Sequence, residues 1–273
     1  MAKSSDQTPL VSDVFGLQNV KEILRLVYPD LLQPATRQLG SNLKTIFEYL
    51  SIPLLRMKFA VAETKLQYKR RLQVLIAEMD KIPSEKQCAI PSSIAAPALD
   101  QLSIESDEDI SSLFIKVLLS SSSTDTIGLV HPSFVGCIRN LSSDEAKLLK
   151  YLNEQRTVPF VKIRLQFNET EGLEKSPILT GMETLPDLQF SQNIPMYLDN
   201  LVGLGIIAKG EGALSDVVKW YDPLFKMYAG TKERIQAEGH TDGKHYPVGF
   251  QLGFYNITSY GRLFLEACMK KSD

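Results

Sequence analysis

His131 and Ser133 lie two residues apart, and a histidine near a serine is one starting point for nucleophilic catalysis. Such a pair needs a carboxylate behind the histidine and a nucleophile elbow around the serine, and neither is evident in the sequence. The run from His131 to Val135 is instead typical of a helix start, with Pro132 in the first turn. We therefore assign no catalytic residue and expect a protein that is not an enzyme.

His240, Asp242 and His245 form a second polar group, within a glycine-rich turn. Metal sites use closer spacing on a helix or strand and further ligands, so we expect an exposed loop, with no metal and no cofactor. The three cysteines are far apart and odd in number, which argues against a disulfide framework and favours a reducing cytoplasm. The N-terminus lacks the apolar core of a signal peptide, and no apolar run reaches about 18 residues.

Amide and lysine side chains in the last third of the chain could contact nucleic acid. A recognition helix should offer cations and amides to DNA, but the helix expected from Gln192 to Val202 has no Arg or Lys and carries Asp199. Because phosphate contacts dominate affinity, this charge favours a protein-binding or scaffold role over DNA binding. The candidate nucleic-acid face comprises Gln192, Asn193, Asn200, Lys209, Lys219 and Lys244.

A basic group accompanies the long amphipathic helix expected over residues 54–79. Cations beside an apolar face are typical of helices that lie on membranes. The same pattern suits a helix packed in a bundle or against a second copy with its basic face in solvent, and length and periodicity do not separate the two. The candidate membrane or partner face comprises Lys58, Lys65, Lys69, Arg70 and Arg71.

The composition is that of an ordinary globular protein and excludes global disorder. The chain has 273 residues, 44% of them hydrophobic and 23% charged, with a net charge of −2. This balance gives no bulk attraction to nucleic acid or anionic lipid. The basic excess lies in residues 1–90, where 13 Lys and Arg face 9 Asp and Glu. The length suits one large domain or two modest ones.

Hydrophobic periodicity predicts a flexible tail over 1–16 and then a helical domain over 17–138. Helices are expected over 17–28, 29–47, 54–79, 98–102 and 110–121, and another from about 132. Three prolines make residues 82–97 an expected extended connector. The acidic residues Asp107, Glu108 and Asp109 are cap candidates for the helix that follows them.

Residues 139–271 mix both periodicities and predict a winged-helix-like α+β domain. A helix is expected near Asp144, capped by residues 141–143, then a strand over 160–167 and a loop over 168–187. The recognition-type helix over 191–202, turns at 210–212 and 239–243, a strand over 248–257 and a helix over 259–270 complete it. The predicted fold is mainly α: a helical bundle followed by this winged-helix-like domain.

Several motifs, in order, resemble the Abi-alpha (abortive infection alpha) family, a bacterial domain of unknown biochemistry. The pieces are Tyr28 to Pro34, Ile90 to Leu99, Leu113 to Leu119, His131 to Val135, Leu141 to Leu149, Leu201 to Ile207 and Ile257 to Phe264, within about residues 28–270. The resemblance implies a prokaryotic role in defence against phage. It supplies no catalytic residues.

Three hypotheses about function follow. The first is a non-enzymatic, cytoplasmic defence protein that acts through protein recognition, oligomerisation or both. The second is a winged-helix regulator that binds nucleic acid. The third is an effector that disrupts membranes through its N-terminal amphipathic helices, associating with the membrane on activation.

Overall fold

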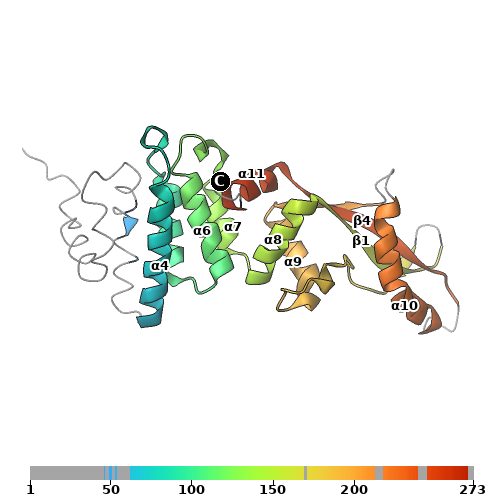
Figure 1. The fold of residues 1–273 in the computed structure, drawn as a ribbon. Helices are drawn as coiled ribbons and strands as arrows, with labels where there is room; N and C mark the ends of the chain where they lie inside the picture. Colours follow the sequence, from blue (N-terminus) through green and yellow to red (C-terminus); the bar gives the residue numbers. More distant parts are fainter. Residues whose placement is uncertain are drawn as a thin grey trace, which may run out of the picture. The chain divides into compact units, whose positions relative to one another are not determined.

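The computed structural model describes residues 46, 49, 50, 53, 62–168, 171–212, 218–238 and 245–269. The expected tail over 1–16, the helices over 17–28 and 29–47 apart from Ile46, and the first part of the helix over 54–79 lie outside the described residues. The described part contains eight α-helices and one four-stranded sheet, so the prediction of a mainly α chain is confirmed (Figure 1).

Two compact units divide the described chain. The first holds the residues up to Asn140 together with Ala267–Met269, and the second holds Leu141–Glu266. The sequence places the boundary two residues earlier and does not foresee that the chain returns to the first unit at its end. In that return, the Ser120 hydroxyl donates to the Ala267 carbonyl oxygen at 2.7 Å.

The first unit is a helical bundle. Its buried core is drawn from every helix and includes Leu72, Leu99, Phe114 and Phe134, all at most 1% exposed. Asp107 caps the third helix, because its Oδ1 accepts from the Ile110 amide at 3.0 Å. The helices are α4 (Ala62–Met79), α5 (Ser92–Ile104), α6 (Glu108–Ser120) and α7 (Ser133–Arg139).

Helix α5 begins six residues earlier than the prolines suggest, so the expected connector over 82–97 is too long. Pro97 lies inside the helix, where it removes one backbone hydrogen bond, but its side chain is exposed. The apolar residues Ile94, Ala95 and Ala98 are buried around it. Burial of that face outweighs the cost of the proline, because the lost bond falls on the solvent side where water replaces it.

The second unit is an antiparallel sheet with helices, in the strand order β2-β1-β4-β3. Its strands are β1 (Thr157–Gln166), β2 (Gly172–Glu174), β3 (Ile207–Glu211) and β4 (Val248–Ile257). Strand β1 begins three residues before the predicted strand and β2 falls in the predicted loop, while β4 matches its prediction. The helices are α8 (Ser143–Gln155), α9 (Ile194–Gly203), α10 (Asp222–Glu238) and α11 (Ser259–Met269).

Helix α10 is absent from the sequence-based prediction and covers part of one sheet face. Leu224 packs on Val161 together with Tyr221, the residue just before the helix, and Ile235 packs with Ile163 and others in a second cluster. Its exposed positions hold mixed charges and Gly230, which weaken the periodic signal. The helix therefore depends on burial against β1 and β4 rather than on its own propensity.

Candidate functional site

A buried carboxylate lies at the start of α8. Asp144 is 3% exposed, and its two oxygens accept hydrogen bonds from the backbone amides of Gln189 and Phe190 at 2.9 and 2.8 Å. The Tyr197 hydroxyl donates to the same group at 3.1 Å. Asp144 thus ties the loop before α9, and α9 itself, to the first turn of α8.

Glu145, the next residue, is equally buried and bridges the same elements. It completes a capping box, in which its Oε2 accepts from the Ser142 amide at 2.7 Å and the Ser142 hydroxyl accepts from the Glu145 amide at 3.3 Å. Its Oε1 accepts from the Asn200 amide nitrogen at 2.7 Å. Both carboxylates are therefore satisfied by hydrogen bonds that hold α9 against α8.

The charge of Asp144 is stabilised despite its burial. Desolvation is the largest single effect and raises the pKa of Asp144, but the hydrogen bonds from Gln189, Phe190 and Tyr197 and the charge of Lys147 together lower it by more. Lys147, 3.9 Å away, adds a smaller effect in the same direction. The pKa of Asp144 consequently lies below its ordinary value, which suits a permanent structural anion rather than a general acid or base near neutral pH.

The predicted amide contacts to nucleic acid separate in the structure. Gln192 is exposed, Asn193 is half-buried, and Asn200 is held by Glu145. On α9 the exposed positions are Met196, Asp199 and Gly203, which follow Gln192 at helical spacing and share one face. This outward face offers one amide, one thioether and one carboxylate.

The predicted lysines lie on other elements of the second unit. Lys209 is exposed on β3, with its ammonium 5.5 Å from the centre of the Phe160 ring. Lys219 is exposed in the short 3-10 helix Val218–Tyr221 before α10, and Lys244 lies outside the described residues. No basic residue shares the outward face of α9 with Gln192 among the residues that the structure describes.

The basic residues predicted on α4 do not form one solvated face. Arg70 is exposed, Lys65 and Lys69 are half-buried, and Lys58 lies outside the described residues. Arg71 is 5% exposed, so its assignment to a membrane or partner face is wrong. The helix rotates successive residues by about 100°, which turns Arg71 inward next to Arg70.

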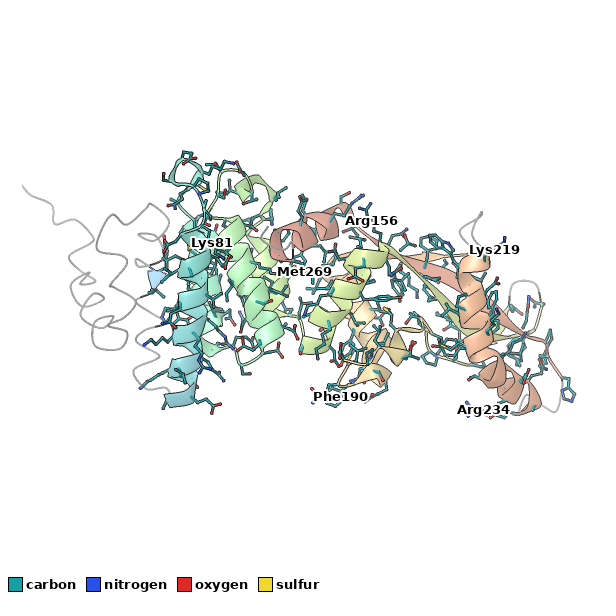
Figure 2. The ribbon with its side chains drawn as sticks, in the orientation of Figure 1. Lys81, Arg156, Phe190, Lys219, Arg234 and Met269 are labelled. Atoms are coloured by element: carbon teal, nitrogen blue, oxygen red, sulfur yellow. The ribbon has the colours of Figure 1, made fainter. Side chains whose placement is uncertain are left out.

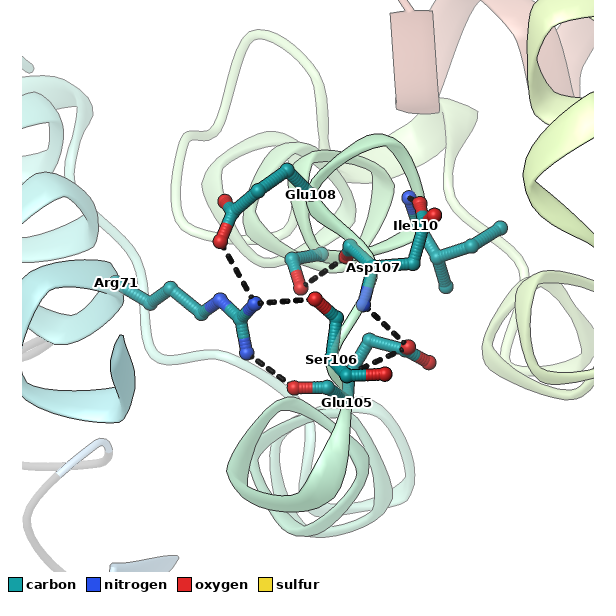
Figure 3. A network of polar contacts seen from close by, with 7 residues as sticks. Arg71, Glu105, Ser106, Asp107, Glu108 and Ile110 are labelled. Atoms are coloured by element: carbon teal, nitrogen blue, oxygen red, sulfur yellow. Dashed lines mark hydrogen bonds and ion pairs between the residues drawn. The ribbon is translucent and has the colours of Figure 1, made fainter. Parts of the chain in front are cut away.

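The Arg71 guanidinium joins α4 to the link between α5 and α6 (Figure 3). It donates to the carbonyl oxygens of Glu105 and Ser106 and to the Glu108 carboxylate, the last at 2.9 Å. The Glu105 carboxylate accepts in turn from the Ser106 and Asp107 amides at 2.8 and 2.9 Å. A planar cation with several donors is needed to reach these acceptors together.

We expect Arg71→Lys to lower the free energy of unfolding of the first unit by about 2 kcal/mol, because one ammonium cannot donate to both carbonyl oxygens and to the Glu108 carboxylate at once. Urea unfolding followed by circular dichroism at dilute protein would measure it. The matched control is Arg70→Lys at the exposed neighbouring position, with an expected change below about 0.5 kcal/mol. Equal effects at the two positions would contradict a structural role for Arg71.

His131 and Ser133 form a helix-start contact. The His131 Nδ1 lies 2.6 Å from the Ser133 hydroxyl and 3.2 Å from its amide, and both residues are exposed at the beginning of α7. Of the turn over 239–245, only His245 is described, and it is exposed. Among the described residues, no three His, Cys, Asp or Glu side chains are grouped as a metal site.

None of the described helices combines the length and the apolar character needed to cross a bilayer.

Comparison with known proteins decides the family. The family model described as abortive infection alpha matches residues 61–268, which is more than half of the chain and includes the capping box and the α9 segment. The chain belongs to the abortive infection alpha family. The resemblance found in the sequence motifs is thereby confirmed for this range.

Other comparisons are sparse. The chain matches no curated protein. The chain is similar to the solved structure of an uncharacterized protein from the hydrocarbon-degrading marine bacterium Alcanivorax borkumensis, with 16% sequence identity and a TM-score of 0.30. The match covers 50% of this chain and 92% of that chain.

Sequence reasoning missed the carboxylate pair at the start of α8, although a signal was present. A serine three residues before a glutamate and ahead of an apolar run marks a capping box, and Ser142 and Glu145 have that spacing. No local sequence pattern identifies Asp144, because its hydrogen-bond donors lie 45 to 53 residues away in the chain.

Proposed function

We propose that the chain is a non-enzymatic abortive-infection protein whose second unit recognises a protein partner through the outward face of α9. The family assignment supports a role in defence. The observation that supports recognition of a protein is the composition of α9 and of the segments that flank it. From Ser176 to Ala208 the sequence contains no Lys or Arg, although this stretch includes the whole helix.

The order of elements supports a winged-helix reading of this unit. Helix α8 precedes β1, α9 precedes β3, and β4 lies between β1 and β3 in the sheet. In a winged helix the helix before the strand pair takes the recognition position. Here α10 is inserted between the two strands that would form the wing.

Apolar exposure on this segment favours a protein partner over a phosphate backbone. Met196 is 58% exposed, and Phe190, two residues before Gln192, is 46% exposed. Figure 2 labels Phe190. Methionine and aromatic side chains are enriched in protein interfaces, whereas nucleic-acid faces are basic. The carboxylates of Asp144 and Glu145 hold α9 in place and so pre-organise the face.

A phage challenge with structure-guided variants tests the proposal. Met196→Asp should abolish protection of bacteria carrying the gene and leave folding unchanged, because the side chain is already exposed. The control is Met227→Asp on α10, 48% exposed in the same unit, which should keep protection. Protection by neither the wild type nor the variants against a varied phage panel would contradict the defence role.

The electrophoretic mobility of labelled DNA at low salt, with and without the protein, tests the alternative that the protein binds nucleic acid. We expect no retardation of the DNA by the purified protein. DNA binding that falls steeply with salt and is lost on Lys209→Glu or Lys219→Glu would contradict the protein-partner proposal. It would favour the hypothesis of a winged-helix regulator that binds nucleic acid. Vesicles of anionic lipid provide the equivalent test for the membrane alternative, with no co-sedimentation expected.

A further inference from the structure

Strand β3 forms one edge of the sheet in the second unit. It pairs with β4 on one side, and no strand of the described chain pairs with it on the other. Within it Ala208, Lys209 and Glu211 are exposed. An exposed edge strand presents a row of backbone donors and acceptors to which another extended segment can add. The direction in which those groups point decides whether this edge can accept one.

Alternate residues of β3 turn their backbone groups outward. The Gly212 amide donates to the Leu252 carbonyl oxygen at 2.9 Å, in the same register that pairs Glu211 with Gly253. Hydrogen bonds to one neighbour come from every second residue of an antiparallel strand, so the even-numbered residues bond to β4. The amides and carbonyls of Lys209 and Glu211 therefore point away from β4, and they have no backbone partner among the residues that the structure describes.

The features that usually protect an edge strand are missing from β3. It pairs with β4 through five consecutive residues without a bulge, and no proline interrupts it. A lysine also protects an edge by projecting beyond it, but the Lys209 ammonium lies 5.5 Å from the centre of the Phe160 ring on β1, two strands inward. This side chain thus lies along the sheet face and leaves the outward backbone groups accessible.

The two charged residues of β3 have opposite signs and share one face of the strand, because Lys209 and Glu211 lie two positions apart. Neither forms an ion pair with the residues that the structure describes. Their neighbours on β4, Tyr255 and Gly253, are uncharged. Asp199 on α9 is a further exposed charge on the Tyr255 side, and as an anion it lies beside Lys209 without competing for it as a cation would.

Two copies of β3 can pair in antiparallel directions around a twofold axis at Gly210. Lys209 of each copy then lies opposite Glu211 of the other, so opposite charges meet on both sides of the axis and the outward amides and carbonyls bond to one another. A register centred on Lys209 would place like charges opposite each other. Closed dimers use this kind of self-complementary contact. We propose that two copies of this chain associate edge to edge through β3, with Gly210 at the axis.

The residues at the proposed axis suit a close approach. The backbone groups of Gly210 bond to β4, and residues paired in that orientation come within about 4.5 Å of each other between Cα atoms. A Cβ at Gly210 would lie 2.3 Å from the Phe254 ring, so this half-buried ring leans over the edge strand. Pairing of the two edges brings the Phe254 rings of both copies together over the seam and removes apolar surface from water.

The length of the edge sets the strength of the expected association. Strand β3 has five residues and is about 17 Å long. A contact of this length belongs to the weak and transient class of interfaces. The dimer should therefore form as the concentration rises and weaken with salt, because the charges that fix its register are exposed.

The first experiment measures the molecular mass of the full chain by sedimentation velocity from about 1 μM to about 300 μM. We expect a monomer–dimer equilibrium for the wild type. Lys209→Glu and Glu211→Lys should each raise its midpoint concentration about tenfold, because either change places like charges opposite each other. The double variant should recover the wild-type midpoint, since it restores opposite charges in exchanged positions. Lys219→Glu is the control, with the same charge change at an exposed position of the same unit outside β3.

The second experiment tests the backbone contacts. Glu211→Pro removes an amide hydrogen that points away from β4, so the sheet keeps its own hydrogen bonds while the edge loses a donor. We expect loss of the dimer and an unchanged circular dichroism spectrum. Hydrogen exchange of the wild type needs no substitution: the amides of Lys209 and Glu211 should exchange more slowly above the midpoint concentration than below it.

Three results would each overturn the proposal. They are a wild type that stays monomeric at the highest concentration, a double variant no better than the single ones, and exchange of the two amides that does not change with concentration. The inference does not depend on what α9 recognises. The β3 variants are scored by mass and hydrogen exchange and the α9 variants by phage protection, so the failure of one proposal leaves the other to be judged separately.

Discussion

Replacing Asp144 by asparagine should destabilise the second unit by about 3 kcal/mol. The amide has nearly the same shape, but it presents one acceptor oxygen where the carboxylate presents two. The part-buried amides of Gln189 and Phe190 and the buried Tyr197 hydroxyl would then compete for it, and a donor left without a partner away from water costs about 1–3 kcal/mol. The loss should loosen the α9 segment before it affects the sheet.

Urea unfolding followed by the fluorescence of Trp220 would measure this change. Trp220 is the only tryptophan in the chain and lies in the second unit, so its signal reports on that unit. Glu154→Gln is the matched control, because Glu154 is an exposed acid on the same helix and should change the stability by less than about 0.5 kcal/mol. Similar losses for both variants would show that the Asp144 hydrogen bonds are not decisive.

The pH dependence of the free energy of unfolding provides a second test of the role of Asp144. Because the pKa of Asp144 is lowered on folding, the unfolded chain binds more protons than the folded chain between the two values, and stability rises with pH there. The contribution of Asp144 is therefore complete above its ordinary value of 3.8 and is lost as the pH falls through its folded value. The difference between the wild type and Asp144→Asn should shrink over that acidic range and stay constant above it.

Replacing Gly261 by alanine should cost the second unit about 3 kcal/mol or more. A Cβ at this position in α11 would lie 2.0 Å from the Ile206 carbonyl oxygen and 2.9 Å from its carbon, and backbone atoms cannot move aside as a flexible side chain can. Thr258 fixes this approach from both sides: its hydroxyl donates to the Gly205 carbonyl oxygen at 2.6 Å and accepts from the Gly261 amide at 2.8 Å.

Gly230→Ala is the matched control for Gly261→Ala. Gly230 lies within α10 of the same unit, and a Cβ there meets nothing within 4 Å. Because alanine favours the helix, this variant should gain about 0.5–1 kcal/mol. Trp220 fluorescence in urea measures both proteins, and a loss at Gly230 as large as that at Gly261 would refute the close-approach explanation.

The candidate site could be predicted only in part. The sequence predicts the α9 segment as the recognition element and shows that it contains no Lys or Arg. The structure adds which residues of that segment face outward. The amides of Asn193 and Asn200 looked equivalent to Gln192 in sequence, because composition does not reveal that Glu145 binds Asn200. A hydrogen bond between residues 55 positions apart leaves no local mark.

The sequence by itself determined the elements whose signals are local. Asp107 caps α6, the N-cap Ser142 of α8 lies within the predicted cap 141–143, and alternating apolar residues mark β4, because each of these patterns involves residues within a few positions of one another. Only the tertiary structure decided that α5 continues through Pro97, that α10 is a helix and that Arg71 is buried beside the exposed Arg70. In each case the deciding free energy comes from burial against distant segments, which local periodicity does not encode.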